Sequence, residues 1–98
     1  MVKYNVESNN LNVSLSGNLG TKDIFDLRKE LIGYVGKGVR DISVDLRELS
    51  DIDSTGLGVL ISANKLVNEK NGHMYIKGVD GHIREIFKLT RLDKVFNM

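Results

Sequence analysis

The spacing of hydrophobic and polar residues changes along the chain. Near the start, two short segments, Tyr4–Glu7 and Leu11–Ser16, flank the polar Ser8-Asn9-Asn10. Apolar and polar residues alternate in the second segment, which is typical of a strand with one buried face. We therefore predict that the chain opens with a β-hairpin.

From Thr21 onward, the apolar residues recur at helical spacing. Thr21 is a suitable N-cap residue, and the glycine-rich segment 33–38 weakens the far end of the helix. Four apolar residues share one helix face: Ile24, Leu27, Leu31 and Val35. The pattern predicts a first helix over Lys22–Tyr34.

The middle of the chain repeats this change of period. The run Ile42–Leu46 alternates apolar and polar residues, which predicts a strand that leads toward Asp51. Apolar residues then return at helical spacing until Asn71-Gly72, a pair that readily adopts the left-handed conformation that ends helices. We predict a second helix over Thr55–Glu69.

The last third of the chain contains a strand-like run, Met74–Ile76, and a helical set of apolar residues after Asp80. Strands that alternate with helices of this length imply parallel pairing through crossover connections. The expected fold class is therefore α/β. We expect one domain over residues 1–98, with a mixed, mostly parallel sheet, an N-terminal hairpin and helices packed on the sheet.

Composition and net charge exclude several classes of protein function. A chain of 98 residues with 41% hydrophobic and 28% charged residues is typical of one globular domain. A net charge of +1, with the basic residues scattered, disfavours direct nucleic-acid binding. The sequence has no cysteine, no apolar secretory leader and no apolar run long enough to span a bilayer, so we expect a cytoplasmic protein without a membrane anchor.

The segment Asp51–Gly58 lies at a strand-to-helix junction and contains the residues best suited to chemistry. A phosphate on Ser54 would lie at a helix start, where free N–H groups and the helix dipole favour an anion, although Asp51 and Asp53 oppose it. Phosphoserine carries about −1.5 to −2 charges, which is enough to change what a surface binds. The segment is thus suited to a switch.

A structural interpretation competes with the switch. Ser and Asp are preferred N-cap residues, so Ser54 or Asp53 would serve only to cap the second helix, and the pattern alone favours this interpretation. Gly56 and Gly58 each cost about 1 kcal/mol relative to alanine in a helix. Their presence predicts the close approach of another backbone or of a partner.

Three segments of the sequence, Val44–Leu46, Asp53–Gly58 and Leu89–Phe96, together resemble the STAS family of anti-sigma factor antagonists. The resemblance implies that Ser54 is phosphorylated by a partner that is both a serine kinase and an anti-sigma factor. It implies that the unphosphorylated protein captures this partner and frees sigma, that phosphorylation releases the partner, and that a metal-dependent serine phosphatase resets the switch.

The resemblance also implies where the partner binds and what the chain lacks. The implied partner-binding residues are Asp53, Ser54, Thr55, Gly56, Leu57 and Gly58. No catalytic residue, cofactor or metal of its own is implied, and we expect a monomer or a weak dimer. Family members often have aspartate at the position of Gly20, so its absence indicates a partner with a different charge at that point.

Two other functions fit parts of the sequence. Asp51, Asp53 and Thr55 match the Asp-x-Asp-x-Thr pattern of magnesium-dependent haloacid dehalogenase-like phosphatases. However, residues 47–50 separate Asp51 from the apolar strand run, and no later acidic pair completes a metal site. The second alternative is a STAS scaffold or an accessory subunit of a lipid-transport system, without a switch.

The remaining candidates are interpreted as structural. His73 and His82 lack the spacing of a metal site or a triad, so both are expected at the surface. Four aromatic residues lie on or near apolar stripes and are expected to pack in the core: Phe25, Tyr34, Phe87 and Phe96. An apolar contact beside Ser54 is expected from Leu57 together with Val59 or Leu60, at least one of which belongs to the core.

Overall fold

The computed structural model describes residues 1–96 and 98. Its elements confirm the predicted order of strands and helices. They are β1 (Val2–Glu7), β2 (Asn10–Asn18), α1 (Thr21–Gly36), β3 (Asp41–Asp51), α2 (Ser54–Glu69), β4 (Met74–Lys77), α3 (Gly81–Leu89) and a short 3₁₀ helix, η1 (Leu92–Lys94). No helix of the described residues is long and apolar enough to cross a membrane.

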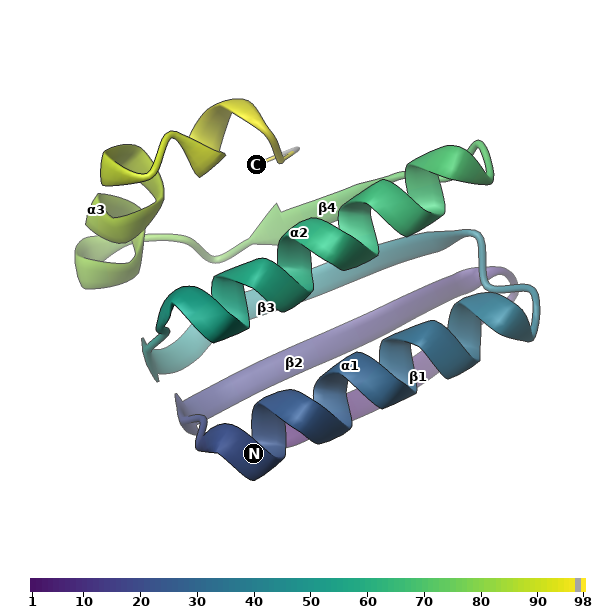
Figure 1. The fold of residues 1–98 in the computed structure, drawn as a ribbon, viewed down its shortest axis with the longest axis horizontal. Coiled ribbons are helices and arrows are strands. Elements are labelled where there is room, and N and C mark those ends of the chain that lie inside the picture. Colours follow the sequence, from purple (N-terminus) through teal and green to yellow (C-terminus); the bar gives the residue numbers. More distant parts are fainter. Residues whose placement is uncertain (97) are drawn as a thin grey trace.

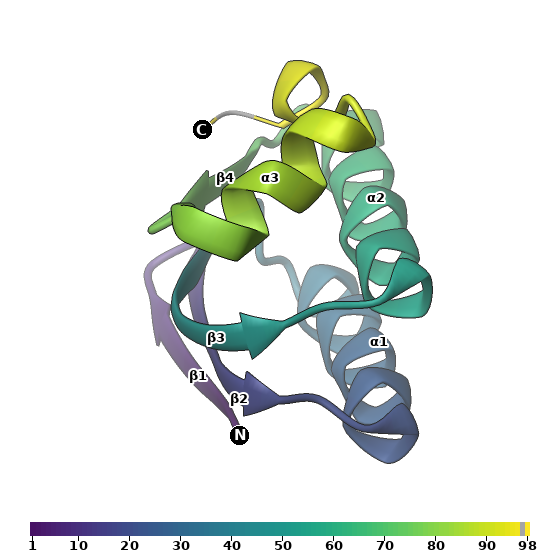
Figure 2. The same ribbon diagram turned by 90° about the vertical axis from the view of Figure 1, so that its left-hand side faces the viewer.

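The four strands form one sheet in the order β1-β2-β3-β4. β1 pairs with β2 in antiparallel fashion, whereas β2, β3 and β4 run parallel to one another. α1 and α2 cover one face of this sheet, and α3 and η1 lie beyond β4 (Figures 1 and 2). The predicted α/β fold class, a mixed sheet with an N-terminal hairpin, is confirmed.

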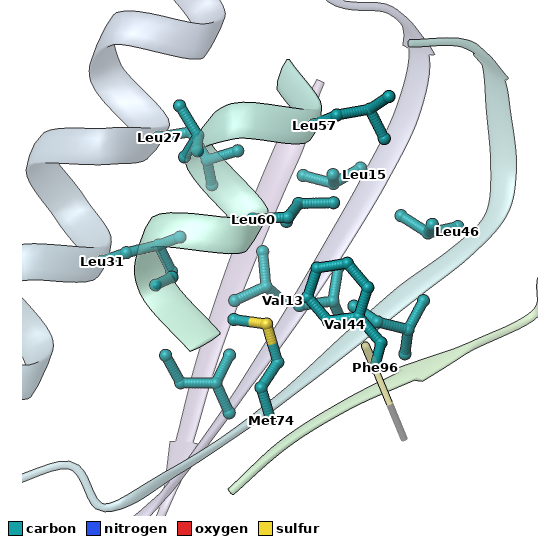
Figure 3. Close-up of a cluster of buried hydrophobic side chains, with 14 of the residues drawn as sticks. Val13, Leu15, Leu27, Leu31, Val44, Leu46, Leu57, Leu60, Met74 and Phe96 are labelled. Atoms are coloured by element: carbon teal, nitrogen blue, oxygen red, sulfur yellow. The ribbon is translucent and has the colours of Figure 1, made fainter. Parts of the chain in front are cut away.

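The core lies between the sheet and the first two helices. One row of paired residues, Tyr4, Val13, Val44 and Ile76, crosses all four strands and faces the helices. Apart from Tyr4, these side chains are buried. Figure 3 shows leucines of α1 and α2 in one cluster with the strand residues Val13, Leu15, Val44 and Leu46. The alternation of the strands and the helical spacing of the leucines therefore meet at one apolar layer.

β3 is longer than its alternation predicts. Ser14 pairs with Asp45 but Ser16 pairs with Glu48, so one residue of β2 opposes two residues of β3 in a β-bulge. The bulge interrupts the alternation after Leu46, which is why the sequence alone indicated an end there. Pairing resumes beyond the bulge, and β3 reaches Asp51.

Arg47 and Asp45 stabilise the bulge. The Arg47 backbone N–H donates to Asp45 Oδ1 over 3.0 Å, and its guanidinium Nη2 lies 2.7 Å from Asp45 Oδ2. Hydrogen bonds from the Arg47 side chain, opposed by burial, hold the pKa of the Asp45 carboxyl below its ordinary value. This pair makes the irregular part of β3 a defined feature of the fold.

The opposite end of α2 is fixed by a glycine. Gly72 is buried, and a side chain there would collide with the Arg40 carbonyl oxygen. The Arg40 guanidinium donates from Nε and Nη2 to the Asn71 carbonyl at 3.2 and 3.1 Å. The Asn71-Gly72 stop predicted from the sequence therefore also joins the end of α2 to the segment that precedes β3.

The aromatic residues follow the prediction with one exception. Phe87 and Phe96 are buried with their ring centroids 6.0 Å apart, and Tyr34 is half-buried 5.6 Å from the ring of Tyr4. Phe25, which was expected in the core, is 63% exposed. Phe25 directly follows the buried Ile24, and a step of about 100° per residue carries it off the apolar face of α1.

We predict a large difference between two phenylalanine truncations. Phe87→Ala is expected to lower the free energy of unfolding by about 3–5 kcal/mol, because it leaves a cavity in the core. Phe25→Ala is expected to change it by less than about 0.5 kcal/mol, because the ring is mostly exposed. Urea denaturation followed by circular dichroism measures both values, and equal losses would contradict the packing described here.

Candidate functional site

The three parallel strands end at one edge of the sheet, where three helices begin. β2, β3 and β4 end at Asn18, Asp51 and Lys77, and each is followed by a helix. In Figure 2 this edge faces the viewer, with β2 and β3 running into the starts of α1 and α2. Helix N-termini carry partial positive charge and free N–H groups, so this edge is suited to anions and to partner contacts.

The start of α2 shows which residue caps the helix and which presents a free side chain, a question that the sequence left open. Asp53 is the N-cap residue, and its Oδ1 accepts a hydrogen bond from the Gly56 N–H over 2.9 Å. Ser54 is the first residue of the helix and is exposed. Among the hydrogen bonds of the described residues, none involves the Ser54 hydroxyl. Asp53 therefore caps the helix, and the hydroxyl remains available to solvent or a partner.

Gly56 and Gly58 differ in what surrounds them. A Cβ on Gly56 would lie 2.8 Å from Ile52 Cγ1 and 3.2 Å from Ile24 Cδ1. This glycine therefore makes room for core side chains, whereas the close approach of another backbone or of a partner was expected. A Cβ on Gly58 would have nothing within 4 Å. The structure thus explains Gly56 by packing, and it leaves open space above Gly58.

The apolar residues near Ser54 point inward. Leu57, Val59 and Leu60 are all buried, so none of them offers the exposed apolar contact that was expected beside Ser54. Thr55 is exposed next to Ser54. The accessible part of the segment 53–58 therefore consists of Asp53, Ser54 and Thr55, with Gly58 half-buried behind them.

A shallow hollow adjoins the start of α2. It has a volume of about 150 Å³ and is lined by Asn18, Leu19, Asp51, Ile52 and Asp53. Gly20 lies directly after this lining, where it is exposed as the N-cap of α1 and donates its N–H to the Asp23 carboxylate over 3.1 Å. Gly20, where the family resemblance implied an aspartate, is therefore close to the hollow.

His82 contacts this edge from α3. Its Nε2 lies 3.1 Å from Asp51 Oδ1, and the same oxygen accepts the Ile52 N–H over 2.8 Å. Both side chains are exposed, which confirms the surface position expected for His82. Sequence reasoning missed the pair because 31 residues separate its members, and no periodic signal links them.

The phosphatase-like alternative gains one feature and lacks another. The sequence indicated that residues 47–50 separate Asp51 from the strand, which weighed against this alternative. This was wrong, because β3 extends to Asp51. However, the Asp53 carboxylate is engaged in the helix cap. Within residues 1–96 and 98, no group of three or more His, Cys, Asp or Glu side chains is placed to hold a metal ion. The Asp53 carboxylate thus serves the helix cap, whereas Ser54 next to it is exposed.

Comparison with known proteins decides the family. Residues 2–97 match the family model described as "Mlab, STAS domain". The chain belongs to the STAS family of anti-sigma factor antagonists. It is 33% identical over 86 residues to the anti-sigma-B factor antagonist of Staphylococcus aureus strain NCTC 8325, a match that covers 88% of this chain and 80% of that protein.

Solved STAS structures share the fold. The unphosphorylated form of the anti-sigma factor antagonist SpoIIAA superimposes with a TM-score of 0.81 at 18% identity, over 97% of each chain. The phosphorylated form of SpoIIAA from Bacillus gives a TM-score of 0.85 at 18% identity, covering 100% of this chain and 89% of that one. The STAS resemblance inferred from the sequence is confirmed.

We expect Asp53 and Ser54 to differ in their effect on stability. Asp53→Ala should lower the free energy of unfolding by about 0.5–2 kcal/mol, because it removes the cap, and Asp53→Asn should retain most of it. Ser54→Ala should change stability by less than about 0.5 kcal/mol. Thermal and urea denaturation test this, and a loss for Ser54→Ala equal to that for Asp53→Ala would show that the serine also caps the helix.

Proposed function

We propose that this protein is an anti-sigma factor antagonist whose activity is switched at Ser54. In its unmodified state it binds an anti-sigma factor that is also a serine kinase, and phosphorylation of Ser54 releases that partner and makes sigma factor unavailable again. The names of its relatives support the antagonist role. The observation that carries the site is the exposed Ser54 at the first position of α2, with the capping role taken by Asp53.

In the proposed reaction this chain supplies only the hydroxyl. The kinase provides magnesium-ATP, and the Ser54 oxygen attacks the γ-phosphorus. The new bond is Oγ–P, the bond from the γ-phosphorus to the bridging oxygen breaks, and ADP leaves. The hydroxyl proton passes to a base of the kinase. The serine phosphatase later hydrolyses the phosphoserine and regenerates the free hydroxyl.

The charge change explains why such a step would release the partner. Phosphorylation adds about −1.5 to −2 charges. They would lie within three residues of Asp51 and beside Asp53, both exposed carboxylates. The N-terminus of α2 partly compensates them within the protein, so the fold is retained. A partner surface that desolvates a neutral hydroxyl would instead meet a strongly hydrated dianion.

The proposed docking surface is the segment 53–58, with different roles for its residues. Asp53, Ser54 and Thr55 are exposed and available for direct contact, and Gly58 offers unoccupied space. Gly56 and Leu57 are buried, so they would support this surface from below. We further propose that the protein acts in the cytoplasm as a monomer or weak dimer, away from membranes and without direct contact to nucleic acid.

The modification itself is directly measurable. Incubation with magnesium-ATP and the cognate kinase is expected to add a single phosphate to wild type at Ser54 and none to Ser54→Ala. Ser54→Ala is expected to bind the partner constitutively, and Ser54→Asp to bind partially more weakly, because one carboxylate carries less charge than phosphate. Intact-mass analysis with peptide mapping and a pull-down test these outcomes.

Equal partner affinity for wild type, Ser54→Ala and Ser54→Asp would reject the switch. Absence of modification by a kinase that phosphorylates a known antagonist in the same assay would also reject it. Either result would favour the second candidate, a STAS scaffold or lipid-transport accessory subunit, because such a module uses the fold without the chemistry at Ser54.

Gly58 offers a separate test of the docking surface. Gly58→Ala is expected to raise the free energy of unfolding by up to about 1 kcal/mol, since alanine favours helix and its Cβ has open space. The same methyl group is expected to weaken partner binding about tenfold by occupying the contact surface. Calorimetry on wild type and the variant measures both effects. A stabilised variant with unchanged affinity would show that the partner does not contact Gly58.

A further inference from the structure

The outer edge of β1 presents a regular set of backbone groups. Met1 and Ser16 exchange two backbone hydrogen bonds, from the Met1 amino group over 2.8 Å and from the Ser16 N–H over 2.9 Å. In an antiparallel pair, such hydrogen-bonded positions alternate with positions whose N–H and C=O groups point away. The backbone groups of Val2, Tyr4 and Val6 therefore point to the open edge, where Figure 2 shows no further strand.

A hollow of about 430 Å³ lies between this edge and α1. Its lining consists of Val2, Tyr4, Asp23, Asp26, Lys29 and Glu30. Three carboxylates thus face one ammonium group. Asp26 also pairs with Lys22 over 2.9 Å, but both side chains are largely exposed, and such surface pairs exchange partners at little cost.

The pKa of Tyr4 reflects its burial first and the nearby negative charges second. Burial, followed by the negative charges of Glu30, Tyr34 and Asp26, raises the pKa of Tyr4 to about 12. The phenol therefore stays neutral far above its ordinary pKa of 10.0. Val2 and Tyr4 line the hollow from β1, and the three carboxylates line it from α1.

We propose that the open edge of β1 binds an extended segment of a partner protein that has lysine or arginine at every second position. Such a segment would add a strand to the sheet through the free backbone groups of Val2, Tyr4 and Val6. Alternate side chains of an added strand lie on the face of the sheet that α1 covers, so the basic ones would enter the hollow. The intervening side chains would lie beside Lys3, Asn5 and Glu7.

A second copy of this chain fits the edge less well than a basic segment. If two β1 strands paired, each would place Val2, Tyr4 and Val6 on the side of the hollow, and none of these side chains carries positive charge. The carboxylates of Asp23, Asp26 and Glu30 would then gain no counter-charge. Charge complementarity therefore selects a basic partner segment over self-association.

This surface is separate from the proposed switch. The groove between α1 and α2 is lined from α1 by Arg28, Leu31 and Ile32, whereas the hollow is lined by Asp23, Asp26 and Glu30. The hollow therefore lies on the flank of α1 that faces away from α2 and Ser54. The affinity of the β1 edge for its partner segment is expected to be the same whether or not Ser54 is phosphorylated.

The test uses the whole protein and a blocked seven-residue peptide of alternating lysine and valine. We expect ¹⁵N-detected titration to shift the amides of Val2, Tyr4 and Val6, with weaker binding at higher salt. Glu30→Gln should weaken the affinity by about two- to fivefold, whereas Glu69→Gln, on the exposed end of α2, should leave it unchanged. Ser54→Asp should bind the peptide like wild type.

Two control peptides separate charge from strand addition. The same peptide with glutamate in place of lysine should not bind, and one with proline in place of valine should not bind, since proline cannot form the ladder. Equal binding of the proline peptide, or unchanged affinity in Glu30→Gln, would overturn the proposal. Concentration-dependent shifts of the β1 amides without peptide would overturn it in favour of a homodimer.

Discussion

Parallel pairing of β2 and β3, with one face of both strands buried, is the constraint on which the rest of this structure depends. Parallel neighbours cannot be joined by a tight turn, so the chain must cross over the sheet, and α1 makes that crossing. The same geometry brings the ends of β2 and β3 to one edge. The start of α2, with Ser54 exposed, lies at that edge because β3, which directly precedes α2, ends there.

At this edge, helix capping and presentation of a free hydroxyl belong to two adjacent residues. Asp53 satisfies the Gly56 N–H, and Ser54 follows it with a hydroxyl that the helix does not need. A serine used as the cap would be tied to the backbone, and its modification would cost the helix a hydrogen bond. Because the two roles are separate, a change at the Ser54 hydroxyl would cost the helix no capping hydrogen bond.

The sequence predicted most of the fold because its signals are local. Alternation in β2 and helical spacing in α1 and α2 each reflect burial of one face, and the structure confirms them. The end of β3 was missed because a bulge shifts the alternation, and Phe25 was misplaced because its neighbour Ile24, not Phe25 itself, lies on the buried face. The contact between His82 and Asp51 and the hollow beside β1 come from residues far apart in sequence, which no periodic pattern connects.

Gly72, against the Arg40 carbonyl, and the exposed residues around Ser54 differ in how freely they can be exchanged. No side chain fits at Gly72, so this position after the end of α2 cannot accept another residue without a shift of the Arg40 backbone. The opposite end carries exposed residues such as Gly20, Thr55 and His82, each of which can change without a clash in the core. The side chains presented around Ser54 can therefore vary without disturbing the core, whereas Gly72 keeps the junction between α2 and the segment before β3 constant.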